Sequence, residues 1–216
     1  MAKYTGAKDV YPDTGVLVNK LGITQADDLD FMEKEIVAPK LLKLQLYPVR
    51  GLFDDKHLKK IHRYLFEDLY GFAGTYRTVD IAKGNTRFAN AYFIADNVKE
   101  LTKAMKQMNA TNRDIFSKEM ADFFAYLNHI HPFREGNGRT NREFTRQIGL
   151  NFGYELDWTK IDRDTYMNAS IKSIHDETAM EPIFQRVITA EEPNLQIKTK
   201  HTNRMKQGIK NKGYGL

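Results

Sequence analysis

The segment HPFREGNGRTNR, residues 131 to 142, combines a histidine, a glutamate, three arginines and two glycines within a short loop. Gly136 and Gly138 flank Asn137 directly before a segment with helical periodicity. A glycine-rich turn that leads into a helix points several backbone N–H groups toward one place, which favours binding of an anion. Glycines before a helix also occur for steric reasons alone, so the glycines by themselves leave both interpretations open.

Two arginines strengthen the anion interpretation. Arg139 and Arg142 fall in the first turn of the expected helix, where the helix dipole opposes a cation by ~0.3–1 kcal/mol each. A residue pair that violates local preference twice indicates a compensating negative partner. Forked guanidinium groups beside backbone amides suit a polyphosphate better than a single carboxylate. The segment therefore predicts a site for a nucleoside triphosphate.

An acid and a base complete the segment. Glu135 would repel phosphate directly but could hold a Mg²⁺ ion that bridges phosphate oxygens. The alternative for Glu135 is an internal salt bridge to Arg134 or Arg139. His131 titrates near neutrality and could take a proton from a hydroxyl that attacks phosphorus, although a histidine after a helix is more often structural, as we expect for His129. The company of Glu135 and the arginines makes His131 the candidate general base.

The surrounding sequence predicts a mainly helical protein with one small β-hairpin. Pro132 disfavours helical geometry in the residue before it, so the apolar helix from Phe116 to Ile130 should stop at His131. β-formers on both sides of Lys83-Gly84-Asn85 predict a hairpin flap. Further helices are predicted over 24–46 with Thr24 as N-cap and a break near Pro39, from Asp54 or Asp55 toward Gly71, from Asn97 through Met105, from the glycines to Gly153, and within 162–189.

Charge is distributed unevenly along the 216 residues. Residues 193 to 216 contain six Lys or Arg and no acid, which leaves 27 basic and 28 acidic residues in 1 to 192. The last segment therefore predicts a flexible basic tail, either a solubilising terminus or a phosphate-binding arm, and the near-neutral remainder does not favour nucleic acid as a partner. Cysteine is absent, and no apolar run approaches the ~20 residues of a membrane span. We expect a cytoplasmic protein without a membrane partner, and secretion as an effector stays open.

The segment HPFREGNGRTNR resembles the Fic signature, HxFx(D/E)GNGRxxR, at every specified position. The upstream stretch HLKKIHRYLFEDLYGFAGTYRTVDIAKGNTRFANAYFI resembles the Fic region that ends in the substrate-facing flap, apart from Phe72, where many relatives carry tryptophan. The resemblance implies a mainly α fold, a Fic-type helical core with a small β-hairpin flap. It places a Fic catalytic domain at 1–192, with its core at about 50–190 and an N-terminal helical extension at 10–48, before the tail at 193–216.

The same resemblance implies a Mg²⁺-dependent protein adenylyltransferase, which transfers AMP from ATP to a Tyr, Thr or Ser hydroxyl of a target protein. His131 would deprotonate that hydroxyl, Phe133 would anchor the loop in the core, and Glu135 would hold Mg²⁺. The ATP-binding residues would be Gly136, Asn137, Gly138, Arg139 and Arg142. The flap that docks the target as an added strand would consist of Lys83, Gly84, Asn85, Thr86, Arg87 and Phe88.

Regulation is also implied by the resemblance. Many Fic proteins carry an inhibitory helix with the pattern (S/T)xxxE(G/N), but the only glutamate here that precedes Gly or Asn is Glu135, inside the loop itself. The N-terminal segment GVLVNKLGITQADDLDFMEKEI resembles the opening of Fic toxins that pair with a small antitoxin. A toxin restrained by a separate antitoxin that supplies the inhibitory glutamate is therefore expected. Alternative functions are transfer of another nucleotide or phosphate-containing group, and a non-catalytic module that binds nucleotide for regulation.

Overall fold

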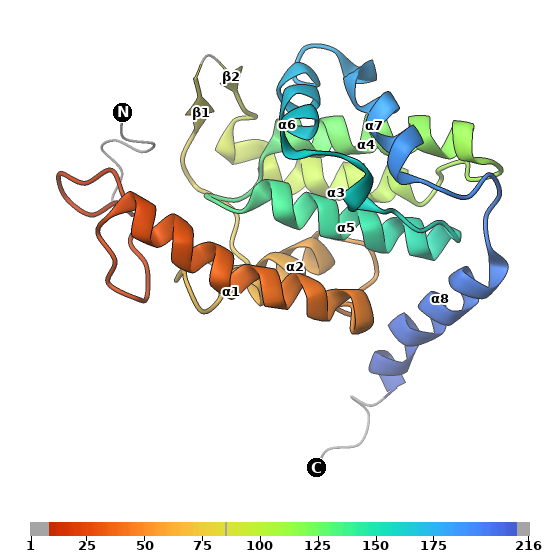
Figure 1. The fold of residues 1–216 in the computed structure, drawn as a ribbon, viewed down its shortest axis with the longest axis horizontal. Coiled ribbons are helices and arrows are strands. Elements are labelled where there is room, and N and C mark those ends of the chain that lie inside the picture. The colour runs from red at the N-terminus through yellow and green to blue at the C-terminus, as the bar shows by residue number, and fades with distance from the viewer. Residues whose placement is uncertain (1–8, 85, 211–216) are drawn as a thin grey trace.

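In the computed structural model, which describes residues 9–84 and 86–210, helices pack around the α4 and α5 pair and the hairpin projects from one end (Figure 1). The described elements are, in chain order, α1 Ala26–Leu46, α2 Asp55–Phe66, β1 Ala82–Lys83, β2 Thr86–Arg87, η1 Ala91–Phe93, α3 Ile94–Met105, α4 Arg113–Ile130, α5 Asn137–Phe152, η2 Trp158–Lys160, α6 Arg163–Lys172, η3 Glu177–Met180, α7 Glu181–Val187 and α8 Leu195–Lys210. The predicted mainly helical fold with one antiparallel hairpin is confirmed. Within these ranges, no helix combines the length and the apolar character that crossing a membrane requires.

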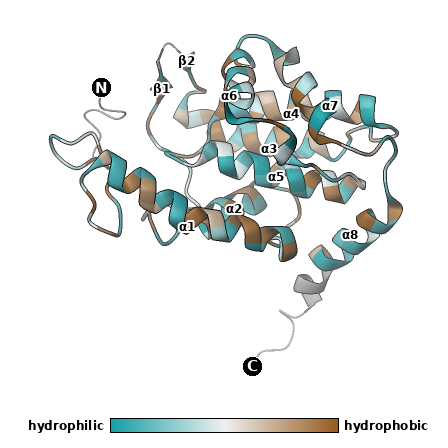
Figure 2. Ribbon diagram, in the orientation of Figure 1, coloured by the Kyte–Doolittle hydropathy of each residue, from teal (hydrophilic) through white to brown (hydrophobic). Residues whose placement is uncertain are grey.

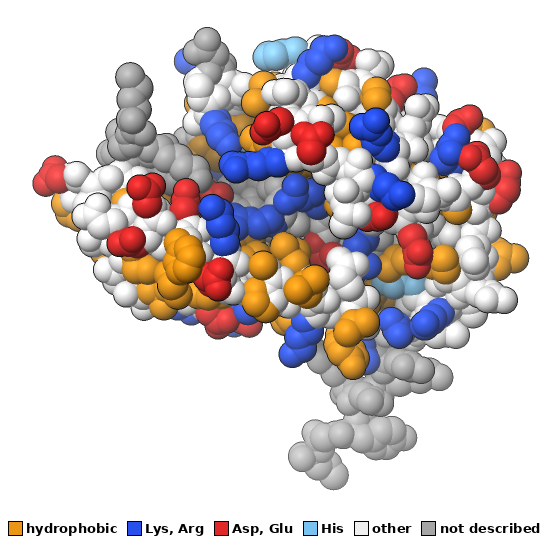
Figure 3. Space-filling model, viewed as in Figure 1, with side chains coloured by type: hydrophobic (Ala, Val, Ile, Leu, Met, Phe, Trp, Pro, Cys, Tyr) orange, Lys and Arg blue, Asp and Glu red, His pale blue; other side chains and the backbone are white. Residues whose placement is uncertain are grey.

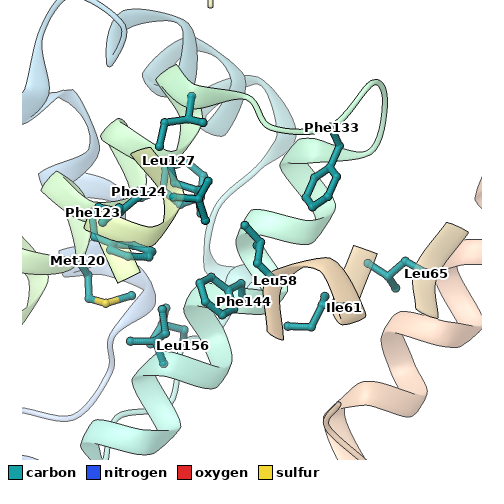
Figure 4. Close-up of a cluster of buried hydrophobic side chains, with 14 of the residues drawn as sticks. Leu58, Ile61, Leu65, Met120, Phe123, Phe124, Leu127, Phe133, Phe144 and Leu156 are labelled. Atoms are coloured by element: carbon teal, nitrogen blue, oxygen red, sulfur yellow. The ribbon is translucent and has the colours of Figure 1, made fainter. Parts of the chain in front are cut away.

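Helix α4 is the centre of the packing. It contacts α3, α5 and α7, and its apolar side chains recur at helical spacing and are fully buried. Burying one such side chain stabilises the fold by ~1.5–3 kcal/mol. Figure 4 shows how side chains from α4, from α5 and α2, and from the loop after α4 meet in one cluster. Its labelled members include Phe124 and Leu127 from α4, Phe144 from α5, Leu58, Ile61 and Leu65 from α2, and Phe133 from the loop.

The boundaries of α4 and α5 follow local signals in the sequence. Asn112 caps α4 by accepting a hydrogen bond from the N–H of Ile115 at 3.0 Å. The helix ends as predicted at His131, whose φ of 46° is left-handed. Helix α5 starts after Gly136 and ends before Gly153, both of which are also left-handed. A short rigid loop between two buried helices therefore carries the residues of the signature.

Two predictions about α1 are wrong. The helix runs unbroken through Pro39, and its N-cap is Gln25, not Thr24. Proline keeps a φ that a helix accepts, and it costs ~3 kcal/mol mainly through a lost hydrogen bond and a local clash. Burial of Val37 and Leu44 on either side of Pro39 offsets this cost. Figure 2 shows the hydrophobic second half of α1 that makes this packing possible.

The predicted flexibility of the tail needs correction for Leu195–Lys210, which forms α8 against α5. Asn194 caps its start by accepting from the N–H of Gln196 at 2.9 Å. His201 and Met205, one helical turn apart, are buried. The charge of the segment pointed to a solvated tail, whereas two buried side chains on one face are enough to dock a helix. Residues 211–216 lie outside the described part of the chain.

Candidate active site

Two hydrogen bonds inside the loop between α4 and α5 fix its conformation. The side chain of Asn137 accepts from the N–H of Phe133 at 2.8 Å and donates to the Phe133 carbonyl at 2.7 Å. Phe133 itself is fully buried, as predicted for an anchor. The amide of Asn137 is therefore engaged within the loop, so only its backbone N–H could contribute to a phosphate cradle.

His62 on α2 is a second anchor, which the sequence analysis missed. Its ring stacks on Phe133 with centroids 3.8 Å apart. Nδ1 accepts from the N–H of Gly74 at 2.8 Å, and Nε2 donates to the carbonyl of Glu135 at 3.0 Å. Burial lowers the pKa of His62 to about 4, so the ring is neutral and both bonds persist at neutral pH. Its place on the buried face of α2 was the available signal, but that face is typical of any core histidine.

Arg77 ties the flap to the end of α4 and was also missed. Its guanidinium donates to the carbonyls of Ala89 at 2.5 Å, Ile130 at 3.1 Å and His131 at 2.8 Å. Its own N–H donates to the carbonyl of Pro132 at 2.9 Å. The last carbonyls of a helix lack partners within it and carry its negative dipole end, so a buried guanidinium satisfies both needs there.

His131 has the properties of a general base. Nδ1 donates to the carbonyl of Asn128 at 3.3 Å, which assigns the proton to that nitrogen and leaves the lone pair on Nε2. The ring of Phe88 stacks on the imidazole with centroids 3.9 Å apart. Burial lowers the pKa of His131 to about 4, against the opposing effect of the Asn128 carbonyl. The imidazole is therefore neutral and able to accept a proton at neutral pH.

The two glycines of the segment differ in why they are needed. A Cβ on Gly136 would lie 2.3 Å from ring carbons of Phe66, and its φ is 77°. Packing and backbone conformation thus both require glycine at 136. A Cβ on Gly138 would meet only the hydroxyl of Tyr166, at 3.5 Å, which is an ordinary contact. Protein packing does not account for Gly138, so a role in admitting a ligand stays a prediction.

The two arginines of α5 have different surroundings. Arg139 pairs with Glu33 of α1, lies 3.7 Å from Glu135 and stacks its Cζ 4.9 Å from the ring of Phe66. Its compensating negative charge is thus already present in the protein. Arg142 lies with its Cζ 4.6 Å from the ring of Tyr166, and within the described ranges no carboxylate forms an ion pair with it. Figure 3 shows Lys and Arg side chains gathered where α1, α5 and the hairpin meet.

Glu135 is compatible with a metal ion that is shared with a ligand. Its Oε1 accepts from the N–H of Gly136 at 2.9 Å, and the side chain is partly buried. Within 9–84 and 86–210, no group of three or more His, Cys, Asp or Glu side chains could hold a metal alone. Of the alternative salt bridges, Glu135 lies 3.7 Å from Arg139, and Arg134 pairs with Asp9 at 2.6 Å. Mg²⁺ at Glu135 would need phosphate oxygens as further ligands, which suits a hard cation.

The flap forms where it was predicted. Ala82 pairs with Arg87 and Lys83 with Thr86 in an antiparallel ladder, and Gly84 has the positive φ of a tight turn. Lys83 and Arg87 are exposed, whereas Phe88 turns inward onto His131. Asn85, the remaining flap residue of the prediction, lies outside the described residues. The hairpin edge and the imidazole are therefore neighbours.

The helical core and the loop at its centre place the chain in the Fic/DOC family, whose model matches residues 52–148. The chain is 34% identical over 185 residues to the probable protein adenylyltransferase Fic of Salmonella typhimurium, covering 83% of this chain and 91% of that protein. It is 36% identical over 195 residues to the protein adenylyltransferase VbhT of Bartonella schoenbuchensis, covering 88% of this chain but only 41% of that protein. The chain thus spans less than half of that relative.

Solved structures agree with the family and the fold. The N-terminal Fic domain of a putative cell filamentation protein from Bartonella quintana, with bound ADP, has a TM-score of 0.79 and 27% identity and covers 88% of this chain and 96% of that one. The BepC protein of Bartonella tribocorum, with bound AMPPNP, has a TM-score of 0.76 and 26% identity and covers 85% of this chain and 97% of that one. The predicted Fic-type core with a hairpin flap is confirmed.

Proposed function

We propose that the chain is a protein adenylyltransferase, which transfers AMP from ATP to a Tyr, Thr or Ser hydroxyl of a target protein. The state of His131 carries the proposal: the imidazole is neutral at neutral pH, its Nδ1 is engaged, and among residues 9–84 and 86–210 no hydrogen bond engages its Nε2, six residues before the start of α5. The names of the relatives from Salmonella typhimurium and Bartonella schoenbuchensis support the activity, and the nucleotides in the two Bartonella structures support the substrate.

The start of α5 binds the triphosphate in this proposal. The first N–H groups of a helix have no partner within it and carry its positive dipole end. The backbone at Gly136, Asn137 and Gly138 presents these groups to the α- and β-phosphates. Arg139 and Arg142 add guanidinium donors for the β- and γ-phosphates. The Arg142 side chain is the better placed of the two for a new anionic partner, because it has no carboxylate partner within the described ranges.

Glu135 is the residue that would hold Mg²⁺, which supplies charge neutralisation between phosphate oxygens when it is bound. Its position at the end of the loop, one residue before the N-cap of α5, places the carboxylate beside the same phosphates. Glu135 would be the carboxylate ligand, and nucleotide and water would supply the other ligands. That pattern is typical of Mg²⁺ in phosphoryl-transfer sites.

His131 performs the proton transfer. The hydroxyl oxygen of the target attacks the α-phosphorus while its proton moves to Nε2. The bond from the α-phosphorus to the bridging oxygen breaks, and pyrophosphate leaves with that electron pair. The flap, Lys83 to Phe88, presents the acceptor by binding its backbone as an added strand, and this mode of binding needs no particular target sequence.

A separate small antitoxin is proposed as the restraint. The N-terminal segment GVLVNKLGITQADDLDFMEKEI, which resembles the opening of Fic toxins that pair with a small antitoxin, supports an inhibitory glutamate supplied by another protein. A synthetic helix with this pattern should lower transfer when added in excess, and the same helix with alanine for its glutamate should not. Equal inhibition by both peptides would remove the support for this restraint. The cytoplasmic location stays a prediction.

The proposed activity is tested with ATP labelled at either the α- or the γ-phosphate, incubated with Mg²⁺, the protein and a host lysate. Label on protein only from α-labelled ATP is the expected result and identifies adenylylation. Label only from γ-labelled ATP would identify phosphorylation instead. ATP binding without label on any protein would support the regulatory module. Mass spectrometry of the labelled band then identifies the acceptor residue by its AMP adduct.

A further inference from the structure

Helix α1, which carries no residue of the Fic signature, contributes an acid to the candidate site. Glu33 is 8% exposed and faces the start of α5. Its Oε1 accepts from Nη2 of Arg139, and its Oε2 accepts from the hydroxyl of Tyr70 at 2.6 Å. Burial and the neighbouring carboxylate raise the pKa of Tyr70, so this hydroxyl remains a donor. Tyr70, Glu33 and Arg139 form a chain of hydrogen bonds that ends at the guanidinium.

Two carboxylates compete for this guanidinium. Glu135, in the loop before α5, lies with its Oε1 3.7 Å from Nη2 of Arg139. Glu33 makes the closer contact, and Phe66 lies against the face of the guanidinium. An arginine side chain carries ~2 kcal/mol of rotamer entropy, so a site that needs one orientation gains from a fixed partner. Glu33 supplies that partner, because its contact with Nη2 of Arg139 is closer than that of Glu135.

We infer that Glu33, oriented by Tyr70, is a positioning residue that holds Arg139 ready for a phosphate of the nucleotide. The inference rests on the proposed function, in which Arg139 binds the triphosphate. Glu33 approaches through Nη2 only, and the structure gives no hydrogen bond from Nε or Nη1 within the described residues. Because the buried Glu33 binds only Nη2 of the Arg139 guanidinium, the other N–H donors of that group are left for an incoming anion.

The opposite role would be competition with phosphate for Arg139, and the two roles differ in the sign of one measurement. Glu33→Gln keeps the shape but removes the negative charge, and its single amide oxygen can replace only one of the two acceptors that Glu33 offers to Tyr70 and Arg139. Positioning predicts that ATP binds about tenfold more weakly, which corresponds to one charge-assisted hydrogen bond. We would measure ATP affinity by calorimetry without Mg²⁺, and KM and kcat with it, and expect the change mainly in KM. Tighter binding of ATP by Glu33→Gln would overturn the inference.

A double-mutant cycle separates positioning from general support of the fold. If Glu33 acts through Arg139, then Glu33→Gln should change ATP affinity little in an Arg139→Ala background. An equal loss in both backgrounds would overturn the inference. Glu35→Gln, an exposed glutamate on the same helix, is the matched control and should behave as wild type. Tyr70→Phe should weaken ATP binding in the same direction by a smaller factor, and it serves as the test if Glu33→Gln does not fold.

Failure of the proposed function would look different. A wild-type protein that binds ATP but transfers no AMP would contradict the adenylyltransferase activity, while the affinity comparison would still decide the role of Glu33. A wild-type protein that transfers AMP, with ATP affinity unchanged in Glu33→Gln, would contradict only the role of Glu33.

Discussion

Two histidines on opposite sides of the loop have similar surroundings and different tasks. His62 stacks on Phe133 at 3.8 Å and His131 on Phe88 at 3.9 Å, and burial lowers the pKa of each to about 4. Both nitrogens of His62 are bonded to the backbone of the protein. In the described part of the chain, only Nδ1 of His131 is so engaged. Burial and a lowered pKa therefore do not distinguish a general base from a structural histidine. What differs between the two rings is Nε2, which is hydrogen-bonded in His62 and has no such partner for His131 within the described residues.

The largest expected effect is on the rate of AMP transfer when His131, the proposed base, is replaced. His131→Ala should lower the rate of AMP transfer by ~10²–10⁴-fold, because a positioned base contributes about that much. ATP affinity should remain near the wild-type value, since the base acts on the incoming hydroxyl and not on the nucleotide. Single-turnover transfer and equilibrium binding measure the two quantities. A parallel loss of ATP affinity would show that His131 has a structural role like that of His62.

His62→Ala, in contrast to His131→Ala, should mainly lower the stability of the protein. The substitution leaves the N–H of Gly74 and the carbonyl of Glu135 without their partner, at ~1–3 kcal/mol for each buried group. We expect a loss of roughly 2–5 kcal/mol in the free energy of unfolding, measured by urea denaturation, together with weaker ATP binding as the loop loosens. The control is His175→Ala, a histidine outside the core whose replacement should not change stability. Unchanged stability of His62→Ala would mean that the loop does not depend on this anchor.

The smallest effect concerns the stack on His131. The folded-state pKa of about 4 lies below the ordinary 6.5, so His131 stays neutral and kcat/KM should fall only as pH drops toward 4. Phe88→Ala admits water to the ring and should raise this pKa toward 6.5, which moves the acid limb up by as much as about two pH units. The pH dependence of kcat/KM measures the shift, with the exposed Tyr92→Ala as control. An unmoved acid limb would assign the low pKa to other neighbours.

How much of the site was predictable depends on distance along the chain. The segment from His131 to Arg142 is contiguous, so its residue types and spacing predicted the helix end and the start of α5, and its resemblance to the Fic signature implied Phe133 as an anchor. Glu33, His62 and Arg77 reach the loop from remote segments, and their types alone are compatible with many roles. No local rule pairs Glu33 with Arg139 across more than a hundred residues. Only packing of α1 and α2 against α5 brings them together.

The errors in the fold have the same origin. Pro39 carries a strong local signal for a helix break, and burial of its neighbours Val37 and Leu44 overrides it. The charge of residues 195–210 predicts a solvated tail, and burial of His201 and Met205 overrides that. In both segments tertiary contacts outweighed a local preference of a few kcal/mol.

The guanidinium of Arg77 joins the return of the hairpin at Ala89 to the carbonyls of Ile130 and His131. In the proposed function the hairpin receives the target and the imidazole deprotonates it. Arg77 helps to fix the two to one another, together with the N–H of Ala89, which donates to the carbonyl of His129 at 3.1 Å, and the stack of Phe88 on His131. A target backbone bound along the hairpin would then lie at a fixed distance from Nε2 of His131. The length of the target side chain would decide whether its hydroxyl reaches Nε2. The length of the acceptor side chain would therefore decide which hydroxyl reacts. The site would distinguish tyrosine from serine and threonine in any surrounding sequence, because the tyrosine hydroxyl lies farther from the backbone.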